Sequence, residues 1–199
     1  KTTAGSDIYT ARADGGSAQK LLSLPLSQVS ISWPSAGTIL AQSAPAAGVP
    51  GVIFSIDAKT GANTPIIYAL GITAIADKTF SHFIYQTADT NRSTYVRDTK
   101  TGLAKPLSFD PVPEQCVFGN ATSSVMYCAT PLAYVPALYL DMRHVGTANT
   151  PLSIITFDLT TGRSTVIATP GTDAGEQADI AEMAISQDDH YLIYIRKGD

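Results

Sequence analysis

The sequence predicts an all-β fold made of repeated four-stranded antiparallel units. A strand–turn–strand pattern that ends in Asp-x-x-Thr-Gly occurs three times, with its aspartates at Asp57, Asp98 and Asp158. A second kind of hairpin, with a polar turn and a more apolar second strand, alternates with these copies. Two alternating hairpins make a four-stranded sheet, so the chain is expected to carry several such sheets in series.

Each Asp-x-x-Thr-Gly copy has a β-branched and aromatic run before its turn and an apolar run after it, which is the pattern of a β-hairpin. Gly supplies a positive φ at the turn, Asp can cap the turn amides, and Thr can bond back to the Asp carboxylate. We therefore interpret the three aspartates as structural residues. The three full copies and one degenerate copy occupy residues 52–61, 94–102, 153–162 and 8–16.

The spacing of the repeats matches the blades of a β-propeller. Equivalent aspartates are 43 residues apart between Asp14 and Asp57 and 41 residues apart between Asp57 and Asp98, close to the about 40–45 residues of one blade. We therefore predict that residues 1–199 form a single β-propeller or a segment of one. The second kind of hairpin is expected at residues 29–40, 75–85, 116–128 and 184–195.

Two places break the repeat. The interval from Asp98 to Asp158 is 60 residues, so we place an insertion at about residues 130–149, between the second and third strands of that blade. Residues 137–144 within it are compatible with a short helix. A second enlarged connection, at about residues 171–182, precedes the last hairpin.

The order of the hairpins gives three complete blades with one half-blade at each end. The two halves can join into a fourth blade, which would make a small four-bladed ring. Alternatively, the chain is a segment of a ring of six to eight blades, whose open ends are paired by more sequence or by a second copy in a head-to-tail dimer. Unpaired strand edges are an aggregation liability, so one of these closures is expected. We favour the larger ring, because lone four-bladed rings are uncommon.

At residues 6–197 the chain resembles bacterial propellers of the TolB-like and WD-type kind. The units of those proteins run from a Ser-x-Asp-Gly-like hairpin to an Asp-x-x-Thr-Gly-like hairpin, as they do here. The resemblance implies the fold. It implies no particular activity, because propellers host many unrelated functions.

Composition and hydropathy argue against nucleic-acid binding and against a membrane span. Charged residues make up 15% of the chain and the formal net charge is -4, which argues against nucleic-acid binding. The longest apolar stretches, such as residues 131–140, are short and contain proline, so we predict no membrane span. The chain begins at Lys1 with neither an initiator Met nor a signal segment, and we expect a processed or partly represented piece of a protein.

The sequence contains no constellation for catalysis, a cofactor or a metal ion. The quinone-enzyme docking motif that begins with Asp-x-x-Thr-Gly continues to a Trp, and no copy here has one. Four acidic residues of the second enlarged connection could gather around Ca²⁺, but no known motif fixes their spacing, so we favour a solvated loop. These four are Asp173, Glu176, Asp179 and Glu182.

Cys116 and Cys128 flank one predicted turn and would lie almost opposite each other on paired strands. Either a cross-strand disulfide or two buried thiols fits this placement. A disulfide would indicate an oxidising compartment, and we expect an extracytoplasmic location in the cell envelope or outside the cell.

The function that we predict is that of a non-catalytic binding or scaffold module, with a protein or glycan partner held by loops at one rim. The candidate surface is formed by the two enlarged connections: 130–149, through Tyr134, Tyr139 and Arg143, which we expect to be exposed, and 171–182. An alternative is that the insertion merely caps a blade. A second hypothesis is that the chain is the propeller part of a larger hydrolase or oxidoreductase.

Overall fold

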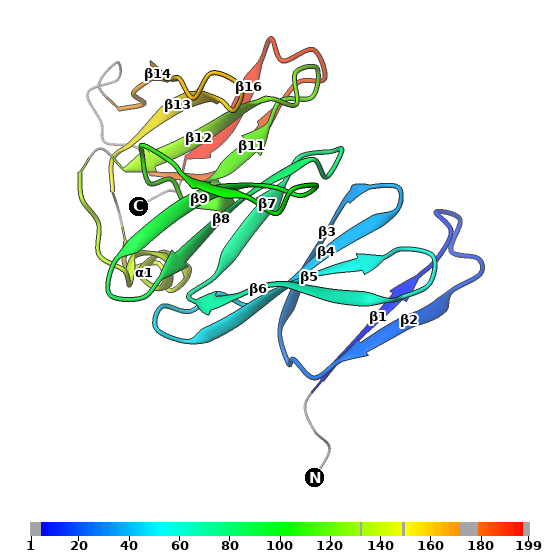
Figure 1. Ribbon diagram of the computed structural model, residues 1–199. Coiled ribbons are helices and arrows are strands. Elements are labelled where there is room, and N and C mark those ends of the chain that lie inside the picture. Colours follow the sequence, from blue (N-terminus) through cyan, green and yellow to red (C-terminus); the bar gives the residue numbers. More distant parts are fainter. Residues whose placement is uncertain (1–4, 132, 149, 172–178, 197–199) are drawn as a thin grey trace.

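The computed structural model describes residues 5–131, 133–148, 150–171 and 179–196. It is an all-β β-propeller arc of three four-stranded antiparallel sheets, with a two-stranded sheet at each end (Figure 1). This is the predicted order of three complete blades with one half-blade at each end. Each complete blade keeps its strands in sequence order across the sheet.

The strands have the following bounds. The N-terminal half-blade contains β1 (Ser6–Thr10) and β2 (Gln19–Leu24); blade one contains β3 (Val29–Ser35), β4 (Thr38–Ser43), β5 (Pro50–Asp57) and β6 (Asn63–Leu70). Blade two contains β7 (Thr73–Ala76), β8 (His82–Ala88), β9 (Arg92–Asp98) and β10 (Ala104–Pro106). Blade three contains β11 (Cys116–Phe118), β12 (Val125–Pro131), β13 (Leu152–Asp158) and β14 (Ser164–Ala168), and the C-terminal half-blade contains β15 (Ile180–Ile185) and β16 (Leu192–Arg196).

The Asp-x-x-Thr-Gly turns close the hairpins as their residue types predict. In blade one, Oδ1 of Asp57 accepts hydrogen bonds from the Thr60 backbone N–H at 2.7 Å and from the Thr60 hydroxyl at 2.8 Å. Asp98 binds Thr101 in the same way, at 2.7 and 2.9 Å. The glycine that ends each turn has a positive φ, 74° at Gly61. These aspartates are therefore turn residues.

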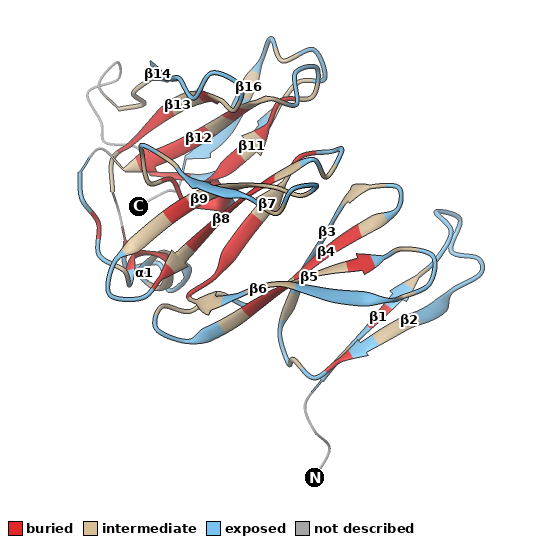
Figure 2. Cartoon of the chain, viewed as in Figure 1, coloured by how far each residue is buried: buried red, intermediate tan, exposed pale blue. Residues whose placement is uncertain are grey.

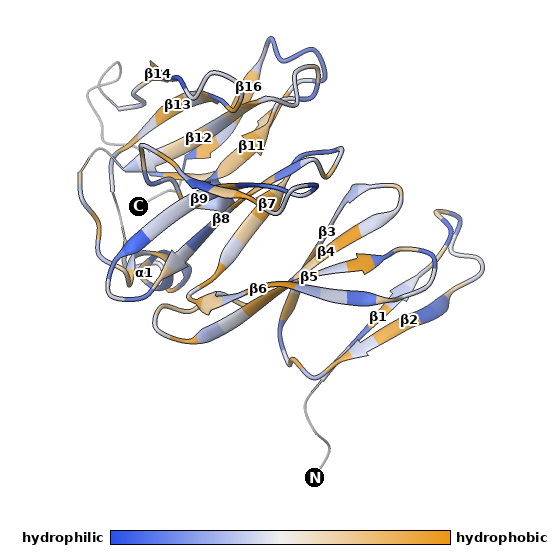
Figure 3. Cartoon of the chain, viewed as in Figure 1, coloured by the Kyte–Doolittle hydropathy of each residue, from blue (hydrophilic) through white to orange (hydrophobic). Residues whose placement is uncertain are grey.

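The core lies between the sheets. The second strands, β4 and β8, are the most deeply buried of their blades, and each packs on the neighbouring blade. Phe83 of β8 packs with Leu40 of β4 and Ile53 of β5, while Ile84, on the opposite face of β8, packs against Met126 of blade three. Figure 2 shows this burial along the strands, and Figure 3 shows polar residues concentrated in the turns.

The predicted insertion lies between β12 and β13 and contains one short helix, α1 (Tyr139–His144). A 3-10 turn, η1 (Pro113–Gln115), precedes β11. The second enlarged connection ends earlier than predicted, because β15 begins at Ile180 and Glu182 belongs to that strand. Asp173 and Glu176 lie outside the described residues.

The two half-blades form separate two-stranded sheets at opposite ends of the arc, so the described chain does not close a ring on itself (Figure 1). The C-terminal half-blade is fixed to blade three by Asp189, which accepts hydrogen bonds from the backbone N–H groups of Asn120 (2.6 Å) and Thr122 (2.9 Å). Among the described residues, no helix is long and apolar enough to cross a membrane.

Candidate functional site

The insertion divides into an exposed tip and a buried anchor. Tyr134, at the tip, is 81% exposed, as predicted. The expectation that Tyr139 is exposed is wrong, because this side chain is only 1% exposed. Arg143 is also largely buried, with 9% of its side chain exposed. Of the three residues proposed from the sequence, Tyr134 alone presents a side chain to solvent.

Tyr139 is buried because two guanidinium groups pack against its ring. The Cζ atom of Arg92, from β9, lies 5.3 Å from the ring centroid, and the Cζ atom of Arg143 lies 5.7 Å from it. Both distances are within the range of cation–π attraction. The helix is therefore held to blade two through its first residue.

Arg143 carries the second attachment of the helix. Its guanidinium forms an ion pair with Asp179 and donates a hydrogen bond through Nη2 to the Ile180 carbonyl at 2.8 Å. Burial acts to lower the pKa of Arg143, but the hydrogen bonds to Asp179 and Tyr139 outweigh it and raise the pKa. Arg143 is therefore a cation, and Asp179 is its counter-ion rather than a member of a solvated acidic loop.

Arg92, whose side chain is buried, belongs to a polar network of blade two that centres on the partly exposed Asp110. Its Nε and Nη2 atoms donate to Oδ2 of Asp110 at 3.0 and 2.8 Å. Asp110 also accepts from the Thr94 hydroxyl at 2.6 Å and from Gln86 at 3.3 Å. Such charge-assisted bonds fix the connection between β10 and η1 against β9. Sequence reasoning missed this network, because no spacing rule joins Arg92, in a strand, to Asp110, 18 positions away in a connection.

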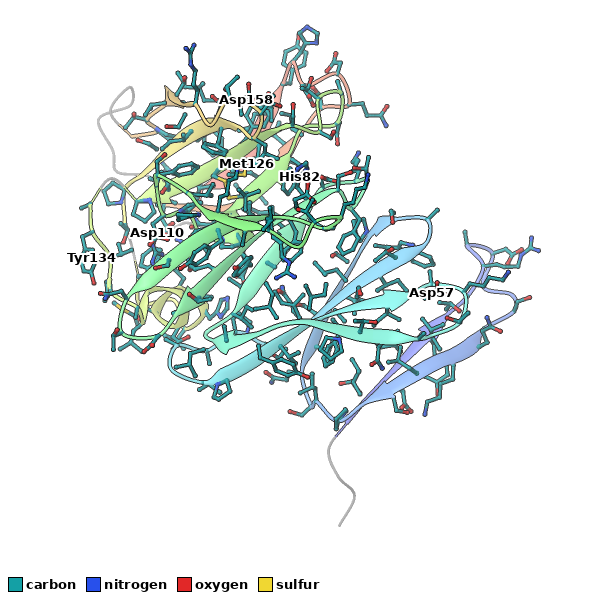
Figure 4. All side chains as sticks on the ribbon, viewed as in Figure 1. Asp57, His82, Asp110, Met126, Tyr134 and Asp158 are labelled. Atoms are coloured by element: carbon teal, nitrogen blue, oxygen red, sulfur yellow. A yellow bond between two sulfur atoms is a disulfide. The ribbon has the colours of Figure 1, made fainter. Side chains whose placement is uncertain are left out.

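A cavity of about 340 Å³ opens between blades two and three beside the insertion. Tyr134 and Phe109 form aromatic parts of its wall, and the Arg92–Asp110 pair forms a polar part. Figure 4 labels Tyr134 and Asp110 on this side of the molecule. The remaining wall is mostly apolar, from Val135, Ile155 and Val166 among others. Its volume falls at the lower end of the range of small-ligand pockets.

A second cavity, of about 520 Å³, lies along the inner strands of the arc. The first strands of four successive units, β3, β7, β11 and β15, contribute its walls. Trp33, the one tryptophan of the chain, lines it and is 56% exposed. Lys78 is the cationic residue of this wall. The cavity thus follows the face where the blades converge.

Cys116 and Cys128 are joined by a disulfide, with Cα atoms 4.1 Å apart. They are directly paired across β11 and β12. The sequence left a disulfide and two free thiols as alternatives, and the structure has the disulfide. Both residues are buried, and Cys116 also lines the inner cavity.

The described residues contain no group of three or more His, Cys, Asp or Glu side chains placed to hold a metal ion. The three histidines lie apart from one another, and the charged neighbours of each are carboxylates. His82 lies near Asp77 and Asp98. Nε2 of His144 is 2.9 Å from Oε2 of Glu114, and Nδ1 of His190 is 3.1 Å from Oδ2 of Asp188. The two cavities are candidate sites for a ligand.

Comparison with known proteins supports the fold. No family model and no curated protein matches the sequence. Among solved structures, TolB from Acinetobacter baumannii is similar with a TM-score of 0.66 and 14% identity, over 96% of this chain and 43% of that one. A putative TolB from Agrobacterium tumefaciens gives 0.61 and 10%, over 96% and 63%. An oligogalacturonate lyase in complex with manganese gives 0.61 and 13%, over 92% and 49%.

The predicted resemblance to TolB-like propellers is thus confirmed at the level of the fold. At identities this low, the similarity concerns architecture alone. The chain spans less than two thirds of the length of each of these structures. It corresponds to part of a larger propeller protein in all three comparisons.

Proposed function

We propose that the chain is a non-catalytic binding module that holds a protein partner at the surface formed by Tyr134 and the cavity between blades two and three. The observation that carries this proposal is the contrast within the insertion. Its helix is held by the buried Arg143–Asp179 ion pair, while Tyr134 is 81% exposed beside a largely apolar cavity. Tyrosine is enriched at the centres of protein interfaces, where its ring gives a large contact area.

The fixed position of the insertion also supports a binding role. An insertion that hung free would lose conformational entropy on binding, which weakens affinity. Here the Tyr139, Arg143 and Asp179 contacts hold the helix that follows Tyr134. Val135, the neighbour of Tyr134, is buried in one cluster with Tyr139, which restricts the backbone at Tyr134. We place this activity in the cell envelope or outside the cell, a location with which the Cys116–Cys128 disulfide is consistent.

The test uses immobilised chain incubated with cell-envelope extract and a chemical cross-linker. Y134A is compared with wild type and with Y68A, a matched control because Tyr68 is 71% exposed but lies on β6, away from the insertion. We expect one or more proteins to be captured by wild type and Y68A and reduced at least about tenfold with Y134A, as for an aromatic hot spot. Equal capture by all three forms would refute this site.

A second candidate function is that of the propeller part of a larger enzyme. The similarity to the oligogalacturonate lyase favours it, because that protein carries the same arrangement of blades over 92% of this chain. The observation that distinguishes the two functions is the coding sequence around this segment. An adjoining hydrolase, lyase or cofactor domain would favour the enzyme, and an anchor segment would favour the binding module.

A further inference from the structure

The two ends of the arc carry complementary open strand edges. In every complete blade the second strand pairs with the third, as β4 with β5, β8 with β9 and β12 with β13. Within the described residues β16, the second strand of the C-terminal half-blade, pairs with β15 alone. Strand β1 of the N-terminal half-blade corresponds to the third strand of a complete blade, and within the described residues it pairs with β2 alone. Each edge lacks the kind of strand that the other supplies.

Backbone hydrogen bonds fix which residues are equivalent. The turn before β16 is closed by the Ser186 N–H bonded to the Tyr191 carbonyl, as the turn before β8 is closed by Asp77 and His82. Tyr191 therefore occupies the position of His82. The turn after β1 is closed by the Arg12 N–H bonded to the Gly16 carbonyl.

The corresponding bond of blade two joins the Asp98 N–H to the Leu103 carbonyl. Arg12 therefore occupies the position of Asp98, and the equivalence of Asp14 to Asp98 expected from the sequence is corrected by two residues. In blade two, His82 lies directly opposite Asp98 and Tyr85 lies opposite Tyr95. A strand of β1 type placed beside β16 would accordingly put Tyr191 opposite Arg12. Counting along the antiparallel pair, Tyr194 then lies opposite Tyr9.

Side chains of β16 are exposed at positions where the equivalent side chains of β8 are buried. Ile84 and Tyr85 of β8 are 0% and 9% exposed, whereas their equivalents in β16, Ile193 and Tyr194, are 68% and 44% exposed. Ile195 is 58% exposed. Strand β16, which is the second strand of its half-blade, thus exposes its apolar side chains to solvent. Covering them would remove the kind of exposed apolar edge that soluble proteins avoid.

We propose that the occupant of this edge is strand β1 of a second copy of this chain. Two copies would exchange edges in the same way at both junctions, so a head-to-tail pair related by a two-fold axis closes into a ring of eight blades. The partner is this chain because one molecule carries both halves of the missing blade.

The proposed register pairs apolar or aromatic side chains on both faces of the blade that β15 and β16 would form with β1 and β2 of the second copy. Residues directly opposite in an antiparallel pair share a face, and successive residues alternate between faces. Ile8 already packs on Ile39 and Ile56 of blade one, and the register brings Ile195 beside Ile8 on that face. On the other face Tyr194 meets Tyr9, which is 59% exposed in the single chain. The model for this pair is Tyr85 and Tyr95, whose ring centroids are 5.2 Å apart.

Cysteine cross-linking tests the register. Both native cysteines are in a disulfide, so introduced cysteines are the reactive thiols. Y9C and Y194C chains, mixed in equal amounts and treated with a short bis-maleimide, should give a covalent species of about twice 20.9 kDa. Each variant alone should give little. A mixture of Y9C with I193C, whose new thiol lies on the opposite face, is the out-of-register control.

Solution mass tests the dimer independently. Light scattering after size exclusion should give about twice 20.9 kDa for the wild-type chain. I193D/I195D, which places charges on the face that would be buried, should give the single-chain mass with unchanged β-type circular dichroism. A single-chain mass for the wild type at about 50 µM, or equal cross-linking in and out of register, would overturn the proposal. Binding of a partner through Tyr134 is measured separately and would survive that result.

Discussion

Arg143 of the insertion and Asp179 of the connection to the C-terminal half-blade form an ion pair in which the two side chains are 9% and 1% exposed. They are 36 positions apart in the sequence. The pair joins the two segments that interrupt the repeat, and it places the insertion against the strand β15 that follows. The irregular parts of this propeller are therefore attached to one another as well as to the blades.

The first prediction concerns this pair. R143M should lower the free energy of unfolding by about 3–5 kcal/mol, because it leaves the buried Asp179 charge without its partner. The double variant R143M/D179L should lose less than R143M, since both charges are removed together. R163M is the matched control, because Arg163 is exposed in the β13–β14 turn, and it should change stability by less than about 0.5 kcal/mol. Urea denaturation measures all three, and equal losses in the single and double variants would contradict the prediction.

The repeat, the place of the insertion and its short helix could be predicted from the sequence, and the contacts that hold the insertion could not. The Asp57 and Asp98 turns are local: their hydrogen bonds join residues three positions apart, so residue types and spacing determine them. The environment of Tyr139 depends on Arg92, which is far away in the sequence and belongs to another blade. An aromatic residue in an insertion looks exposed when its neighbours in space are unknown. The same reason hid the Arg92–Asp110 network.

The second prediction concerns pH and the turn aspartates. Hydrogen bonds from the Thr101 N–H and hydroxyl hold the pKa of Asp98 below its ordinary value of 3.8. A carboxylate whose pKa is lowered by folding stabilises the fold above the unfolded pKa, and this stabilisation is lost as the pH falls through the folded pKa. D98N should therefore be less stable than wild type at pH 7, and the difference should shrink below about pH 4.

Denaturation midpoints at several pH values measure this difference. T101V, which removes the hydroxyl but keeps the Asp98 carboxylate and the backbone donor, should show a smaller loss at pH 7. A D98N deficit that stays constant from pH 7 to pH 3 would mean that the charge of Asp98 is not what stabilises the turn.

The third prediction concerns the disulfide. Replacing Cys116 and Cys128 together with alanine should cost about 2–4 kcal/mol, because the cross-link closes a short loop and restricts the unfolded chain. The two residues are 12 positions apart. Thiol counting in denaturant should find no free thiol before reduction and two afterwards. Two free thiols in unreduced protein from an oxidising preparation would show that the pair does not bond.

The last prediction separates two effects of glycine at equivalent turns. Gly61 and Gly162 both have a positive φ, 74° and 71°, so alanine at either position adds backbone strain of about 1–2 kcal/mol. They differ in their surroundings. A Cβ at Gly61 would clash with the Leu21 carbonyl oxygen of β2, whereas a Cβ at Gly162 would meet nothing within 4 Å.

G61A should therefore destabilise the protein by clearly more than G162A, because the blade-one turn must also move away from the N-terminal half-blade. The excess loss reports the contact between those two units, since the strain of the positive φ is common to both variants. Thermal unfolding of the two variants in parallel measures the excess. Equal losses would show that the half-blade yields freely to the added methyl group, and that this junction contributes little to the rigidity of the arc.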